Sequence, residues 1–237
     1  MFLSGEKVYL DSPRESDFEV WASWFNDQKI TRYLHYGEIP NSIQQQKKFY
    51  EQAVNNGSII LMIRSKKTNE LKGTISLSKI DLKLKCADLA LVAPVRLSDA
   101  PLGSLEAISL IVSHAFEILG LERVYAEQNF PGLINWTSKM QILGFQIDGF
   151  KKKTFYKNGI YENSVFISIT KEDFNSIKQF RGGTLWPGEL EISNIIKEKQ
   201  NAIKESILEL YQLQISRQDA LVTNLLSPKT EQQSADK

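Results

Sequence analysis

The chain has 237 residues, 42% of them hydrophobic, and its 29 Lys and Arg residues nearly balance 28 Asp and Glu residues, for a formal net charge of +1. This length and composition predict one large domain, or one domain with an appendage, and the balanced charge excludes general electrostatic attraction to nucleic acid or an anionic membrane. One cysteine excludes an internal disulfide, and with two histidines it gives too few soft ligands for a zinc site, so we expect no metal.

The sequence carries no signal for secretion or membrane insertion. Residues 1–7 lack the basic and apolar regions of a signal peptide. No apolar stretch reaches the ~18 residues of a membrane-spanning helix. We therefore expect a soluble, cytoplasmic protein without a membrane or nucleic-acid partner.

The chain opens with a short strand followed by two helices. Residues 7–10 form a β-type run, and Ser12 before Pro13 predicts the start of the first helix, because Pro is favoured at the first helical position. Aromatic side chains then recur every three or four residues, which predicts a buried stripe on a helix that ends near residue 27. These are Phe18, Trp21, Trp24 and Phe25. A second helix is expected over 42–55, after a loop at 35–40.

A hairpin and a strand–helix unit follow. The apolar runs 58–64 and 71–78 flank a polar turn, which is typical of an antiparallel hairpin. Residues 87–92 form a further strand. A Pro-containing loop leads from it to a helix over 104–116, which stops at Gly120.

The second half adds a strand at 123–127, a helix of about ten residues ending at Leu143, and two strands around the turn 157–159. The resulting order predicts an α+β protein. We expect a mixed, mostly antiparallel sheet flanked by helices, with one parallel crossover in its middle.

The C-terminal region changes in character. We predict a domain over 1–180, a linker at 181–188 rich in Gly and Pro, an amphipathic helix over 189–226 and a disordered polar tail at 227–237. A helix of roughly 30 residues cannot bury an apolar face by itself, so it packs on its own domain, on a second copy or on another protein. We expect a homodimer formed through this helix.

Several short motifs carry a resemblance in their order and spacing. They are Trp24-Phe25-Asn26-Asp27, Arg32-Tyr33-Leu34, Glu106-Ala107 before His114-Ala115-Phe116, Gly120-Leu121-Glu122-Arg123-Val124, Leu143-Gly144-Phe145 and Asn158-Gly159-Ile160-Tyr161. Over about residues 5–175 the chain resembles the GNAT family of acyl-CoA-dependent N-acetyltransferases. Within it, the chain is similar to the RimJ/RimL-like branch, which includes amino-sugar N-acetyltransferases. The resemblance implies the GNAT fold and acetyl-CoA as cosubstrate.

The resemblance also implies a coenzyme site. Family members hold the coenzyme A pyrophosphate in the loop before the long helix, where free backbone N–H groups and the helix dipole attract anions. The positions that correspond are Arg96, Ala100, Leu102, Gly103, Ser104 and Leu105, with Leu91 and Val92 offering backbone groups to the thioester and the pantetheine arm. This loop departs from the family pattern, because Leu102 replaces a small residue and Pro101 lacks an N–H.

Four residues are candidates for the chemistry. Asp88 matches a family position for a catalytic base at the start of the central strand, although an outward-facing charge is an equal reading. Glu127 is the second candidate, and His35 is a third because the family's acceptor pocket involves its loop. Many family members have a Tyr that acts as the general acid at the position of Met140. A thioether cannot donate a proton, so Ser138 is the candidate proton donor.

The resemblance implies that the acceptor of the acetyl group is a primary amine. We favour the amino group of a nucleotide-linked amino sugar, since residues 5–10 and the pattern of Trp21, Trp24 and Asn26 look like that group. A protein N-terminal amine is the alternative acceptor. A catalytically silent binding or oligomerisation module is the alternative of a different class, motivated by the altered loop and by Met140.

Overall fold

One mixed sheet organises the molecule. The computed structural model describes residues 1–96 and 98–226. Eight strands pair in the order β1-β2-β3-β4-β5-β6-β8-β7. They are β1 (Leu3–Ser4), β2 (Val8–Asp11), β3 (Ile59–Ser65), β4 (Leu71–Asp81), β5 (Cys86–Val92), β6 (Arg123–Phe130), β7 (Gln146–Lys157) and β8 (Ile160–Thr170). Within the described residues β5 and β6 are the parallel pair, which confirms the predicted α+β sheet with its single parallel crossover.

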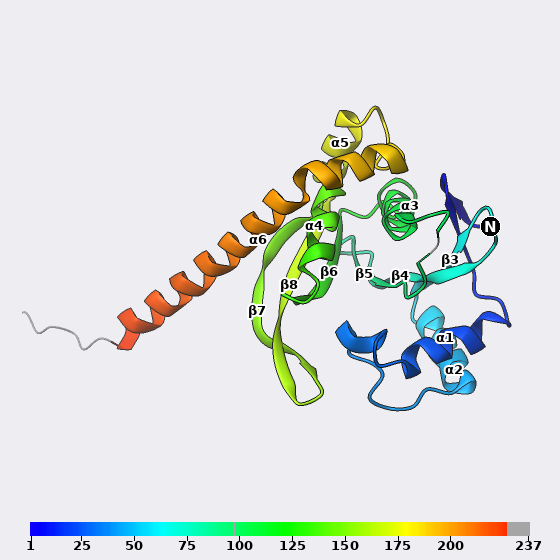
Figure 1. Ribbon diagram of the computed structural model, residues 1–237, viewed down its shortest axis with the longest axis horizontal. Coiled ribbons are helices and arrows are strands. Elements are labelled where there is room, and N and C mark those ends of the chain that lie inside the picture. The colour runs from blue at the N-terminus through cyan, green and yellow to red at the C-terminus, as the bar shows by residue number, and fades with distance from the viewer. Residues whose placement is uncertain (97, 227–237) are drawn as a thin grey trace, which may run out of the picture.

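Helices cover the two faces of this sheet (Figure 1). They are α1 (Asp17–Asn26), the 3-10 turn η1 (Thr31–Tyr33), α2 (Ile43–Asn55), α3 (Gly103–Glu117), α4 (Ile134–Ile142), α5 (Lys171–Phe180) and α6 (Glu189–Leu226). Figure 1 shows α1 and α2 on one side of the sheet and α3 on the other. The strand β3 is buried on both faces because alternate side chains point to opposite sides: Ile60 and Met62 meet α1 and α2, and Leu61 and Ile63 join the α3 core.

The strands β5 and β6 separate after a short parallel contact. They pair only at Cys86, Ala87 and Asp88 on the β5 side. Beyond Asp88, β5 keeps β4 as its neighbour up to Val92, while β6 keeps β8 up to Phe130. Each strand therefore has one free edge toward the other, and the gap between these edges positions the candidate site.

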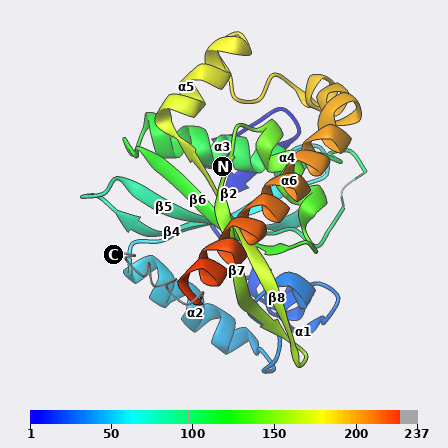
Figure 2. The ribbon, with the colours of Figure 1, turned by 90° about the vertical axis from the view of Figure 1, so that its left-hand side faces the viewer.

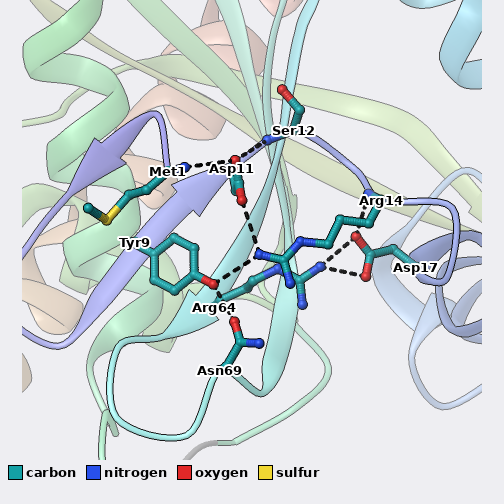
Figure 3. A network of polar contacts seen from close by, with 8 residues as sticks. All are labelled: Met1, Tyr9, Asp11, Ser12, Arg14, Asp17, Arg64 and Asn69. Atoms are coloured by element: carbon teal, nitrogen blue, oxygen red, sulfur yellow. Dashed lines mark hydrogen bonds and ion pairs between the residues drawn. The ribbon is translucent and has the colours of Figure 1, made fainter.

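The first helix begins later than the sequence predicted. It starts at Asp17, and Ser12 and Pro13 lie before it, outside any helix or strand. The Asp17 carboxylate accepts the Arg14 backbone N–H at 2.7 Å and pairs with the Arg64 guanidinium of β3 at 2.5 Å, a buried contact shown in Figure 3. The long-range pair with Arg64 fixes where the helix starts, and no local pattern around Ser12 contains that information.

Besides the 3-10 turn η1, two elements were not predicted. The two-residue strand β1 is shorter than a periodicity can reveal. The helix α5 begins at a capping box, in which the Thr170 side chain accepts the Asp173 N–H and the Asp173 carboxylate accepts the Thr170 N–H. The spacing of Thr170 and Asp173 is the sequence signal that could have revealed this helix.

The helix α6 packs on its own domain with its first part and then projects from it (Figures 1 and 2). Ile192 and Ile207 belong to the main core, and the Gln214 side chain bonds both backbone groups of Phe150 on β7. Farther along, Leu221 and Leu225 are 63% and 82% exposed. The tail predicted at 227–237 lies outside the described residues. No helix in the described residues is long and apolar enough to cross a membrane.

Candidate active site

A cavity of about 420 Å³ occupies the gap where β5 and β6 diverge. We call it the β5–β6 cavity. Asp88, Leu89, Ala90 and Leu91 line it from β5, and Ala126, Glu127, Gln128 and Asn129 line it from β6. Loops, α4 and β7 contribute further lining residues, among them His35, Tyr36, Trp136, Met140 and Phe155.

Two carboxylates face this cavity in different surroundings. The Asp88 side chain is about three-quarters buried, and its Oδ2 accepts a hydrogen bond from Lys79 Nζ at 2.8 Å. This hydrogen bond, followed by the charge of Asp88, raises the pKa of Lys79. Glu127 is exposed, and its Oε1 accepts the Ser164 hydroxyl at 2.6 Å. The cavity therefore holds one shielded, ion-paired carboxylate and one exposed carboxylate.

Three of the four candidate catalytic residues lie at this cavity. The centroids of the His35 and Phe155 rings are 4.8 Å apart. His35 lines the cavity together with Asp88 and Glu127. Ser138 is placed elsewhere: it is buried on α4, its hydroxyl donates to the Asn135 carbonyl at 2.9 Å, and it accepts the Gln200 amide of α6. Met140 does line the cavity and offers no proton.

Sequence reasoning missed Lys79 and Ser164. Lys79 sits at a β-bulge with φ of 49°, next to Ser78, which is paired with Asp88. The left-handed φ and the bulge re-aim the side chain across the hairpin. Ser164 lies opposite Asn129 in the β6–β8 register. Both are revealed only when strand register is known, since neither is adjacent in sequence to its carboxylate.

A second cavity, of about 490 Å³, leads from the β5–β6 cavity to the start of α3. We call it the α3 cavity. Leu91, Val92 and Ser104 line it, and it shares Leu91 and Trp136 with the β5–β6 cavity. We call these two adjoining cavities together the coenzyme channel. Three of the candidate coenzyme residues, Leu91, Val92 and Ser104, line it, and its other end lies at Asp88.

The backbone at the start of α3 has few free donors. The Leu102 N–H donates to the Glu189 carboxylate at 3.0 Å, and the Gly103 N–H donates to the Ala100 carbonyl. The Leu105 N–H donates back to the Leu102 carbonyl. In the described part of the chain the Ser104 N–H has no acceptor, so the anion-binding donor expected here is available at Ser104.

The other loop candidates have structural surroundings. Ala100 and Leu105 are buried in the core. Gly103 lies so close to β2 that a Cβ would stand 2.7 Å from Val8 Cγ1, so packing requires the glycine. Arg96 is exposed near the channel.

Three cations gather around this loop. Burial lowers the pKa of Lys72, and the Arg96 charge lowers it further. The Lys72 ammonium donates to the Val95 carbonyl at 3.0 Å. Burial, followed by the charge of Arg96, also lowers the pKa of Lys139 on α4. These three positive charges repel one another and lie near the free N–H of Ser104. A phosphate group of coenzyme A would relieve their repulsion, so the cluster fits a phosphate site.

A third cavity, of about 570 Å³, opens beside α2. We call it the α2 cavity. It shares Leu34, Tyr36 and Lys79 with the β5–β6 cavity. One set of lining residues is aromatic, namely Trp21, Phe25, Tyr36 and Phe49. Another is neutral and polar, namely Gln52, Asn56, Ser58, Thr74, Ser76 and Ser78. Lys79 is the charged residue of this lining. No cluster of metal ligands is found among the described residues.

Comparisons with known proteins agree with this geometry. Residues 7–129 match the family model described as the acetyltransferase (GNAT) domain. Similar solved structures include a spermidine N-acetyltransferase from Vibrio cholerae in complex with CoA and spermine, at 18% identity and TM-score 0.61, covering 71% of this chain and 98% of that one. A second is RimJ from Mycobacterium smegmatis in complex with CoA-disulfide, at 15% identity and TM-score 0.61, covering 73% and 88%.

A third similar structure is a GCN5-related N-acetyltransferase from Brucella melitensis, at 17% identity and TM-score 0.62, covering 78% of this chain and 85% of that one. At these identities the likeness concerns the fold. No curated protein matches the sequence.

Proposed function

We propose which groups carry the reaction of this chain, which belongs to the GNAT acetyltransferase family. It is an acetyl-CoA-dependent N-acetyltransferase. The observation that carries the assignment of groups is the channel from Ser104 at the start of α3 to Asp88 in the β5–β6 cavity. Ser104, Arg96, Lys72 and Lys139 hold the phosphate groups, and the free edge of β5 at Leu91 and Val92 lies along the pantetheine arm.

Asp88 is the general base. Acetyl-CoA supplies the acetyl group as a thioester. The acceptor nitrogen forms a bond to the acetyl carbon while the C–S bond breaks, and the thiolate leaves with its electron pair. The Asp88 carboxylate takes the proton that the amine loses. Glu127, on the facing strand, attracts the cationic form of the amine into the cavity. Ser138 lies too deep under α6 to reach this chemistry, so we assign no acid.

The lining of the α2 cavity favours an acceptor molecule that carries several hydroxyl groups. Aromatic faces on one side and hydroxyl and amide groups on the other suit a sugar ring, and Lys79 suits a phosphate attached to it. This lining favours a nucleotide-linked amino sugar. The spermine of the Vibrio cholerae complex is a polycation, and the lining of the α2 cavity offers no carboxylate to a second ammonium. The protein N-terminal amine is the second candidate acceptor.

Calorimetric titration with acetyl-CoA tests the function. We expect binding at micromolar strength or better, about 8 kcal/mol. An acceptor screen with nucleotide-linked amino sugars, peptides with free N-termini and spermidine then separates the acceptor classes by turnover. Absence of acetyl-CoA binding, together with capture of a partner through 189–226, would instead support a silent binding module.

We also propose a cytoplasmic homodimer. The projecting part of α6 presents Leu221 and Leu225 to solvent, and a second copy of the same helix would cover them. A lone cysteine without a disulfide partner suits the reducing cytoplasm.

A further inference from the structure

The first part of α6 contacts both walls of the coenzyme channel. At its start, the Glu189 carboxylate accepts the Leu102 N–H at 3.0 Å, one residue before α3. Farther along, the Gln200 amide donates to the Asn135 carbonyl at 3.0 Å and to the Ser138 hydroxyl at 3.1 Å. Asn135 and Ser138 flank Trp136 on α4, which lines the channel.

The two contacts are held apart by a rigid spacer. Gln200 follows Glu189 by eleven positions of continuous helix, which corresponds to about 16 Å at the helical rise. Ile192 within this stretch and Ile207 beyond it anchor the helix in the main core. The distance between the start of α3 and the turn of α4 that carries Trp136 is therefore linked to the length of one helix.

The start of α6 is itself fixed in place. The Glu6 carboxylate accepts the Glu189 N–H at 3.0 Å and the Trp186 indole N–H at 3.3 Å. Because the Glu189 backbone is capped in this way, its side chain meets Leu102 from a defined position. Burial lowers the pKa of Lys72, and the Glu189 charge opposes that shift, so the charge of Glu189 reaches the cation group beside the channel.

We propose that Glu189 and Gln200 are positioning residues that set the width of the acetyl-CoA channel by tying α3 and α4 to α6. This inference rests on the proposed coenzyme site. Neither side chain lines the channel, so each acts through a neighbour: Glu189 through Leu102 and the adjacent free N–H of Ser104, and Gln200 through the α4 turn that bears Trp136.

The test uses full-length variants. Glu189→Ala and Gln200→Leu remove the two contacts. Glu189→Gln keeps a carbonyl acceptor for Leu102 but removes the charge. Glu198→Ala and Gln212→Leu are controls on the same helix, at exposed positions outside these contacts. Calorimetry gives the Kd for coenzyme A, steady-state kinetics separates KM from kcat, and hydrogen exchange of the free protein follows the Leu102 amide.

We expect Glu189→Ala and Gln200→Leu to raise the Kd for coenzyme A and the KM for acetyl-CoA by about fivefold, as for the loss of one hydrogen bond, with kcat nearly unchanged. In Glu189→Ala the Leu102 amide should also lose its exchange protection. Glu189→Gln should keep that protection and bind coenzyme A at least as tightly as the unsubstituted chain, because a negative charge near the phosphates is gone. The two controls should match the unsubstituted chain.

Tighter coenzyme binding by both Glu189→Ala and Glu189→Gln would overturn the proposal, since Glu189 would then compete with the phosphates. Unchanged affinity in Glu189→Ala and Gln200→Leu would overturn it too, while leaving the proposed function standing. Absence of coenzyme binding by the unsubstituted chain would remove both.

Discussion

Lys79 and Asp88 form an ion pair across the β4–β5 hairpin, with Nζ and Oδ2 2.8 Å apart. The pair depends on the bulge that follows Ser78, since regular pairing would alternate the Lys79 side chain to the other face. The side chain of Asp88 is about three-quarters buried, whereas that of Lys79 is 73% exposed. The proposed base is thus shielded by protein on one side and paired with an exposed cation on the other.

Asp88→Asn should lower kcat by about 100-fold, because an amide cannot accept the proton of the amine. The Kd for acetyl-CoA should stay unchanged, since Asp88 lies at the far end of the channel from Ser104. Steady-state kinetics measures kcat, and calorimetry measures the Kd for acetyl-CoA. Lys79→Gln is the matched control: it keeps the carboxylate and should reduce kcat far less. Equal turnover of Asp88→Asn and the unsubstituted chain at every pH would refute the role of Asp88.

Glu127→Gln should act mainly on the acceptor. Its carboxylate is exposed and faces the cavity, so it attracts a cationic amine. We expect a higher KM for the acceptor and a smaller drop in kcat than Asp88→Asn produces. His35→Phe keeps a ring against Phe155 and should change kcat less than tenfold. A larger loss of kcat in either variant than in Asp88→Asn would move the base assignment to that residue.

The sheet could be predicted because its signals are local. The two runs that became β3 and β4 are rich in apolar residues and flank a short turn, and the aromatic stripe of α1 repeats at helical spacing. The strand and helix predictions required only neighbours along the chain. Asp88 became a candidate because it matches a family position for a catalytic base and is a carboxylate within an apolar strand.

The remaining features depend on contacts between distant segments. Glu189 meets Leu102 across 87 positions, and Gln200 meets Ser138 across 62. The burial of Ser138 under α6 could not be read from the helix that carries it. Likewise, the amphipathic pattern of 189–226 showed that a partner was needed, but only tertiary packing shows that the first part of the helix uses its own domain.

Asp17→Asn should destabilise the fold by about 3–5 kcal/mol, because it leaves the Arg64 charge buried without a counter-ion. Both side chains of the pair are 6% exposed. Urea unfolding measures the change, and Glu19→Gln, an exposed neighbour on the same helix, is the control. A loss below ~1 kcal/mol, comparable with that of the control, would mean that water reaches Arg64 in the native state.

Glu106 should make stability depend on pH. Its buried carboxylate accepts the N–H groups of Glu6, Lys7 and Val8, and burial, the largest effect, raises its pKa above 4.5. The folded chain therefore holds this proton more tightly than the unfolded chain, so the stabilisation is present below pH 4.5 and is lost as the pH rises through the raised pKa.

Glu106→Gln tests this dependence. It should cost about 1–3 kcal/mol, since its NH2 group meets backbone donors, but its stability should decline less between pH 4.5 and neutral pH. Urea unfolding across that range, with Glu198→Gln as control, gives the slopes. Identical slopes for Glu106→Gln and the unsubstituted chain would show that Glu106 does not titrate differently on folding.

The last prediction concerns the projecting part of α6. The stripe that begins at Ile207 and Tyr211 reaches Leu221 and Leu225 through steps of four and three, the spacing of a two-helix seam, with Gln at positions 214 and 218 between them. Ile207 is 1% exposed and Leu225 is 82% exposed, so the stripe leaves the domain before it ends. A second copy that covers the exposed end would complete it.

We therefore expect the full chain to sediment as a dimer and the double variant Leu221→Lys, Leu225→Lys to sediment as a monomer with an unchanged unfolding midpoint. A chain cut after Thr184 is a poor test, because it removes Ile192 and Ile207 from the core. A chain ending at Ser216 keeps both and should also be monomeric. A monomeric full chain, or a dimer that survives both changes, would show that the exposed end of α6 does not hold two copies together.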